Sequence, residues 1–144
     1  MMKDAPDHLD ADLILKLYDL RREESLRAAR EKLTSEFWPK NAKEAVAVTA
    51  HEHPLNRTYR QVSTYWEMVY RMARHGIIQG DFLVENNGEG LLLYAKVEPY
   101  LAEIRAATSP RSFQNAEWVA KEVPMGRTIA EHMRARVKKT LAAK

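Results

Sequence analysis

Two histidines close together, His51 and His53, are the first residues that could do chemistry, as ligands of a metal ion. Two positions apart, they cannot share one face of a helix, although both could bind a metal from a loop. The His-Glu-x-x-His arrangement of helical zinc sites is absent, and the sequence defines no third ligand. His51 and His53 are therefore weak metal candidates. Loop histidines without a metal are the better interpretation.

Carboxylates and arginines at helical spacing form a second candidate site. Glu24, Arg27 and Glu31 continue a leucine stripe, and Glu67 and Arg71 stand one helical turn apart in a later segment. One hypothesis is a polar pocket that binds an anion or holds a perturbed carboxylate. The other, which we favour, is an ion-pair network that sets the register between helices.

Positive charge is concentrated at the C-terminal end. Residues 127–144 contain six basic residues and one acidic residue, whereas residues 1–126 contain 17 basic and 19 acidic residues. This helix could dock on the body, lie on an anionic membrane surface, or contact a nucleic-acid backbone. Docking with a solvated basic face is the commonest outcome. The candidate anion or nucleic-acid contacts are Arg127, Arg134, Arg136, Lys138 and Lys139.

Motifs typical of enzymes and cofactor sites are absent from the sequence. Asn87-Gly88-Glu89-Gly90 lacks the Lys-Ser/Thr of a phosphate-binding loop and the third glycine of a dinucleotide motif. There is no Gly-x-Ser-x-Gly elbow, no paired Glu-x-x-His and no cysteine. We therefore expect no cofactor, and an enzymatic role is poorly supported.

The elements that would position these residues are predicted to be helices. The first spans about Leu9 to Phe37, but its apolar face changes direction midway, so it bends or contacts two partners. The helix from Thr58 to His75 has its apolar face on Val62, Trp66 and Val69, and Gly76 ends it in a Schellman motif. The aromatic residues of that helix are expected in the core.

Residues 79–97 can be read in two ways. Asn87-Gly88 between apolar runs favours a β-hairpin. A short helix, a break and a longer helix to about Ala107 is the alternative, with Pro99 on its outer face. The apolar stripe continues on both sides of Pro99, which favours helices.

Several motifs in this order resemble a family of uncharacterised bacterial helical proteins classed as a domain of unknown function. They are Leu17-Tyr18-Asp19-Leu20-Arg21-Arg22-Glu23-Glu24, Leu26-Arg27-Ala28-Ala29-Arg30, Tyr59-Arg60-Gln61-Val62-Ser63-Thr64-Tyr65-Trp66-Glu67, Gly76-Ile77-Ile78, Asp81-Phe82 and Glu98-Pro99-Tyr100-Leu101. The resemblance covers roughly residues 12–120 and implies an all-helical fold. It supplies no activity and no catalytic residue.

We expect a compact, all-α, single-domain bundle of five to seven helices with a long N-terminal helix. Residues 1–8 would be a flexible N-terminus, 9–126 the body and 127–144 a basic amphipathic helix. The predicted core is Leu13, Leu17, Leu20, Leu33, Phe37, Val62, Trp66, Val69, Leu93, Val97 and Leu101. No apolar run reaches the roughly 18 residues of a membrane span, and no signal peptide is evident, so a cytoplasmic location is expected.

The leading functional hypothesis is a non-enzymatic interaction or regulatory module with an unidentified protein partner. A homodimer is a further expectation, because kinked long helices often pair across a two-fold axis. One alternative is a nucleic-acid-associated protein that uses the C-terminal helix. The other is a helical bundle that binds a small molecule or an anion at Glu24, Arg27, Glu31 and Arg71.

Overall fold

A computed structural model describes residues 2–144, which are all-helical and contain no strand. Within these residues, nine α-helices and one 3-10 helix replace the five to seven helices that the sequence predicts. They are α1 (His8–Arg22), α2 (Glu24–Glu36), α3 (Ala42–Ala47), α4 (Asn56–Arg74), α5 (Gly80–Asn86), α6 (Gly90–Val97), η1 (Glu98–Tyr100), α7 (Leu101–Ala107), α8 (Gln114–Glu122) and α9 (Pro124–Ala143). Several are too short to show a full apolar period, which is why the sequence merges them.

The expected long first helix is divided in two at Glu23. That residue takes φ −55° and ψ 136°, and its carboxylate accepts hydrogen bonds from the backbone N–H groups of Ser25 and Leu26. The change in the apolar face therefore marks a bend. Because α1 then turns a different side to the body, Leu20 is 52% exposed rather than in the core, and Leu13 is only half-buried.

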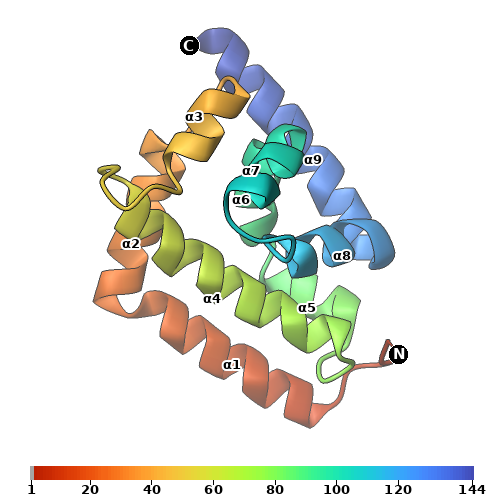
Figure 1. The fold of residues 1–144 in the computed structure, drawn as a ribbon. Coiled ribbons are helices and arrows are strands. Elements are labelled where there is room, and N and C mark those ends of the chain that lie inside the picture. The colour runs from red at the N-terminus through yellow and green to blue at the C-terminus, as the bar shows by residue number, and fades with distance from the viewer. Residues whose placement is uncertain (1) are drawn as a thin grey trace.

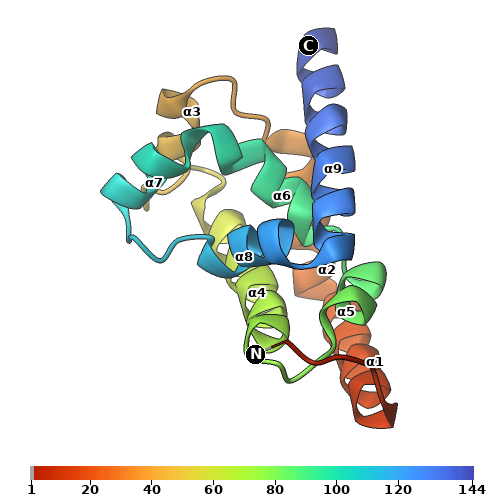
Figure 2. The same cartoon turned by 90° about the vertical axis from the view of Figure 1, so that its right-hand side faces the viewer.

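Helix α4 lies between α2 and α8 (Figures 1 and 2). Its aromatic residues are buried, as predicted, and two phenol groups find backbone acceptors: Tyr65 donates to the Leu17 carbonyl and Tyr70 to the Asn87 carbonyl, each at 2.8 Å. The helix begins at Asn56, two residues before the predicted start. Its end is the predicted Schellman motif, with Gly76 at φ 71° and the Ile77 N–H donating to the Met72 carbonyl.

Residues 79–107 form helices, so the hairpin alternative is wrong. Helix α5 ends at Asn86, α6 begins at Gly90, and the exposed Pro99 lies in η1 between α6 and α7. Gly90 allows α6 to pack closely on α4, since a Cβ there would lie 2.6 Å from Tyr70 Oη and 2.7 Å from the Trp66 ring.

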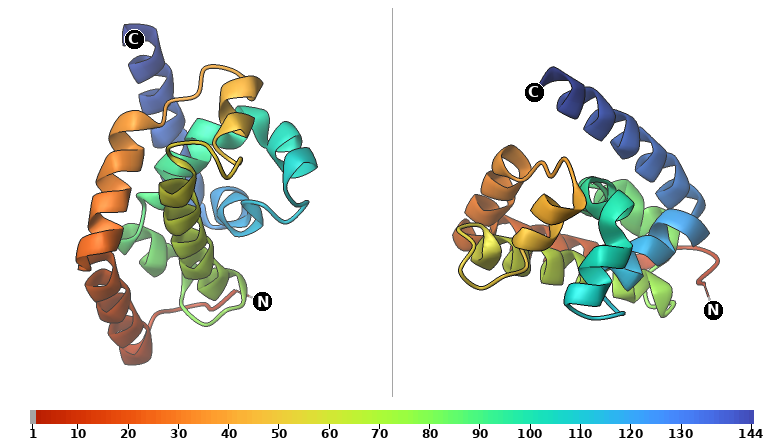
Figure 3. Two further views of the ribbon diagram at one scale, coloured as in Figure 1. Left: turned by 60° about the vertical axis from the view of Figure 1, so that its left-hand side comes forward. Right: turned by 45° about the horizontal axis from the view of Figure 1, so that its top comes forward.

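Helix α9 runs along α6 and also contacts α5 and α8 (Figure 3). Its N-terminal part is integral to the packing: Ala130 is fully buried, and a Cβ at Gly126 would lie 2.1 Å from the Val119 carbonyl oxygen. The C-terminal helix therefore docks on the body. Apart from Leu13 and Leu20, every predicted core residue is buried.

Candidate ligand-binding groove

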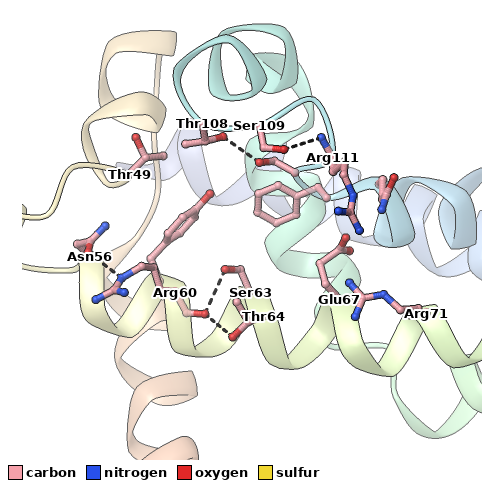
Figure 4. A pocket seen from close by; sticks show the side chains of 14 residues that line it. Thr49, Asn56, Arg60, Ser63, Thr64, Glu67, Arg71, Thr108, Ser109 and Arg111 are labelled. Carbon is pink, nitrogen blue, oxygen red and sulfur yellow. Dashed lines mark hydrogen bonds between the residues drawn. The ribbon is translucent and has the colours of Figure 1, made fainter.

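A groove of about 510 Å³ lies between α4 and the loop that joins α7 to α8 (Figure 4). Its long wall is the solvent-facing side of α4, which carries Arg60, Thr64 and Arg71. The opposite wall is formed by residues 108–114, and Thr49 closes one end from the segment after α3. Three segments distant in the sequence therefore form one concave surface.

Half of the side chains that line this groove carry a hydroxyl group. They are Thr49, Tyr59, Ser63, Thr64, Thr108, Ser109 and Ser112. Several hydroxyls are hydrogen-bonded within the protein: Thr49 donates to the Val46 carbonyl and Thr64 to the Arg60 carbonyl, each at 2.7 Å. The hydroxyls thus make the wall polar, and the guanidinium groups of Arg60, Arg71 and Arg111 add positive charge to it.

Glu67 carries the single carboxylate in the lining, and this carboxylate is hydrogen-bonded to the start of α8. One carboxylate oxygen accepts from the Asn115 N–H at 3.0 Å and the Asn115 side-chain amide at 3.2 Å, and the other accepts from the Ala116 N–H at 2.8 Å. These donors are otherwise unsatisfied at a helix N-terminus. The N-terminus of α8 therefore stabilises the negative charge of Glu67.

Arg71 and Arg111 are exposed cations of the groove with no acceptor for their guanidinium groups. Within residues 2–144, neither side chain makes a hydrogen bond or an ion pair within 4.0 Å. The third arginine, Arg60, donates only to the Asn56 side-chain carbonyl at 3.0 Å. Figure 4 shows Arg71, Arg111 and Glu67 together at one end of the groove and Arg60 toward the other.

Two aromatic rings line the groove beneath this polar wall. Tyr59 and Phe113 are tilted toward one another with centroids 6.2 Å apart, and burial raises the pKa of the Tyr59 phenol. Phe113 has φ 60°, in the left-handed region, which is costly for a residue with a side chain. This backbone conformation lets α8 begin directly after the groove loop.

The structure separates the carboxylates and arginines that the sequence grouped. Glu67 and Arg71 lie in the groove, whereas Arg27 and Glu31 line a second hollow of about 420 Å³ beside α2. Glu24 is exposed in the first turn of α2 and lines neither. In the second hollow, the Arg30 guanidinium donates to both carboxylate oxygens of Glu89, at 2.7 and 2.8 Å, and joins α2 to the start of α6.

Sequence reasoning missed the far wall of the groove. The sequence Ser109-Pro110-Arg111-Ser112 predicts only a loop, although two serines and an arginine within four positions were a signal. The sequence could not show that this loop faces the polar side of α4, because the two segments are some 45 residues apart.

The predicted basic contacts on α9 have different environments. Arg134 donates to both carboxylate oxygens of Glu98, at 2.6 and 2.8 Å, and Arg127 donates to the Lys121 carbonyl. The other three, Arg136, Lys138 and Lys139, are exposed.

The histidine pair does not converge with other ligands. His53 Nδ1 accepts a hydrogen bond from the Leu55 N–H at 3.0 Å, and His51 is exposed. Among residues 2–144 there is no group of three or more histidine, aspartate or glutamate side chains placed to hold a metal ion.

Fold and groove together define an all-helical domain with a hydroxyl- and arginine-lined surface groove. The chain belongs to a family described as a domain of unknown function (DUF4760), whose model matches residues 6–123 and so covers α1 to α8. Searches of curated proteins and of solved structures found no match. In the part of the chain that the structure describes, no helix is both long and apolar enough to cross a membrane.

Proposed function

We propose that this protein is a non-enzymatic binding module that takes a small organic anion, with a carboxylate or phosphate group, into the groove between α4 and the α7–α8 loop. The observation that carries the proposal is the pair Arg71 and Arg111. Both are positively charged, and among residues 2–144 their guanidinium groups have no acceptor; they lie beside a carboxylate whose oxygens already accept hydrogen bonds from α8.

The size and chemistry of the groove support this assignment. Its volume lies within the roughly 300–1,000 Å³ of small-molecule sites. Guanidinium groups bind carboxylates and phosphates through two parallel hydrogen bonds. The rings of Tyr59 and Phe113 provide an apolar surface beneath, so we expect a ligand with an anionic group and a less polar body.

Calorimetric titration with a panel of dicarboxylates and phosphorylated metabolites tests the proposal. The double variant Arg71→Ala/Arg111→Ala should fold normally, because within residues 2–144 these exposed side chains make no hydrogen bond or ion pair. It should bind the selected ligand at least about tenfold more weakly, since one charge-assisted hydrogen bond contributes about 1.5–3 kcal/mol.

Arg57→Ala is the matched control, because Arg57 is exposed on the same helix and lies outside the groove. It should bind as the natural protein does. Equal affinity in the double variant, or no binding of any compound in the panel, would refute the proposal.

Self-association through α1 is a second candidate function. Leu9 and Leu20 of this helix are 60% and 52% exposed, and their spacing of about three helical turns places them on one face. In an antiparallel pair of α1 helices with a two-fold axis between residues 14 and 15, Leu9 would face Leu20 of the second copy. Asp12 would then lie beside Lys16 of that copy, so charge and apolar surface are both self-complementary.

Sedimentation equilibrium tests the association. We expect a weak dimer, because one helix pair is smaller than a standard interface. Leu9→Glu/Leu20→Glu should give a monomer, because like charges would then face each other across the two-fold axis. Ile77→Glu, at an apolar residue 53% exposed outside α1, should leave the equilibrium unchanged. A natural protein that is monomeric at all concentrations would rule this candidate out.

A further inference from the structure

A second concentration of positive charge lies away from the groove, where the end of α9 approaches α6 and the segment after α2. Its central member is Lys96 of α6, which is only 3% exposed. The Lys96 ammonium donates to the backbone carbonyls of Leu33 and Thr34, at 3.3 and 3.2 Å, and lies 3.9 Å from the centre of the Trp38 ring.

No carboxylate neutralises Lys96. Among residues 2–144, no acidic oxygen lies within 4.0 Å of its ammonium. The negative charge of Glu89 acts on Lys96, but both Glu89 oxygens accept hydrogen bonds from Arg30. Carbonyl oxygens in the last turn of α2 and the Trp38 ring offset only part of the cost of burying the charge.

The charges of two further cations act on this buried lysine: Arg136 of α9 and Lys144, which directly follows that helix. Arg136 and Lys144 are exposed, and their charges act with burial to lower the pKa of Lys96 to about 7. Lys144 also lies over the Trp38 ring, 5.8 Å from its centre. Docking of α9 thus brings like charges together instead of separating them.

An anion is the group that would make this arrangement favourable. We propose that Lys96, Arg136 and Lys144 form a binding site for a phosphate group, held by the two exposed cations and stabilised by the charge of the buried one. Arg136 would bind two phosphate oxygens and Lys144 a third. The phosphate could belong to a small metabolite or to a nucleic-acid backbone.

NMR of the lysine Cε groups, followed through a pH titration, tests the site directly. Pyrophosphate should raise the pKa of Lys96 relative to its value in sodium chloride at the same ionic strength. The expected rise corresponds to about a tenfold gain in the affinity of Lys96 for a proton. In the variant Arg136→Ala/Lys144→Ala the pyrophosphate effect should disappear. Lys138→Ala/Lys139→Ala removes two exposed charges of the same helix and should leave the effect intact.

A short single-stranded oligonucleotide distinguishes the source of the phosphate. An effect of the oligonucleotide that Arg136→Ala/Lys144→Ala abolishes would assign the site to a nucleic-acid backbone, and an effect of pyrophosphate alone to a small metabolite. A Lys96 pKa that neither probe changes would overturn the proposal. So would an effect that persists in Arg136→Ala/Lys144→Ala. Neither result depends on Arg71 or Arg111 of the groove.

Discussion

At the scale of single residues, Lys96 is a buried lysine that is only partly protonated at neutral pH. Its pKa in the folded protein, about 7, lies below its ordinary value of 10.5. Between these two values the unfolded chain binds more protons than the folded protein. This group therefore makes the protein more stable as the pH rises from 7, and contributes no further change well below pH 7.

The variant Lys96→Met should remove that dependence. In the natural protein, Lys96 contributes at most about 1.4 kcal/mol per pH unit to the free energy of unfolding between pH 7 and 9. Lys96→Met should show a flatter profile over this range and greater stability at pH 7, because it keeps the packing and removes the buried charge. Urea unfolding at several pH values measures both, and identical slopes would contradict the assignment.

Gly90 is the glycine at which an added Cβ would come closest to buried side chains, 2.6 Å from Tyr70 Oη and 2.7 Å from the Trp66 ring. Gly90→Ala should destabilise the protein by about 1–3 kcal/mol, because a methyl group would overlap Tyr70 and Trp66, which are fixed in the core. Gly88→Ala is the control, since its Cβ would meet nothing nearer than 3.4 Å. Equal denaturant midpoints for the two variants would show that α6 shifts freely against α4.

At the scale of elements, Glu67 joins two helices that are far apart in the sequence. Its carboxylate on α4 satisfies the first N–H groups of α8, and so fixes the edge of the groove. Removing it leaves these donors without partners, which costs about 1–3 kcal/mol.

Glu67→Ala should therefore lower the free energy of unfolding and weaken the protection of α8 amides from hydrogen exchange. Glu67→Gln keeps an acceptor oxygen, so both effects should be smaller. Hydrogen exchange of the Asn115 and Ala116 amides is the sensitive measurement. Unchanged exchange in Glu67→Ala would mean that α8 is held by its apolar face alone.

Element boundaries also show how far local sequence patterns reach. The periodicity of α4 and the continuous stripe across Pro99 predicted helices that the structure contains. The division at Glu23 was visible only as a change of apolar face, because a glutamate is an ordinary helix residue and its capping role depends on the chain turning there. The prediction that Leu20 lies in the core was wrong for the same reason.

At the scale of the whole molecule, the candidate sites depend on contacts that no local pattern contains. Arg71 could be placed on the outer face of its helix, but Arg111 faces the same groove only because α8 packs against α4. Lys96 lies within an apolar run, and its environment is set by α2 and α9, which lie far from it in the sequence. Composition and periodicity thus predict the helical class, whereas the sites follow from how the helices pack.

The central claim is that the groove between α4 and the α7–α8 loop binds an organic anion through Arg71 and Arg111. The most direct measurement is NMR of the arginine side-chain Nε–H groups during titration with the ligand selected by calorimetry. We predict that the resonances of Arg71 and Arg111 shift and saturate together, while that of Arg57 stays in place. Saturating binding that leaves both groove arginines unperturbed would contradict the account.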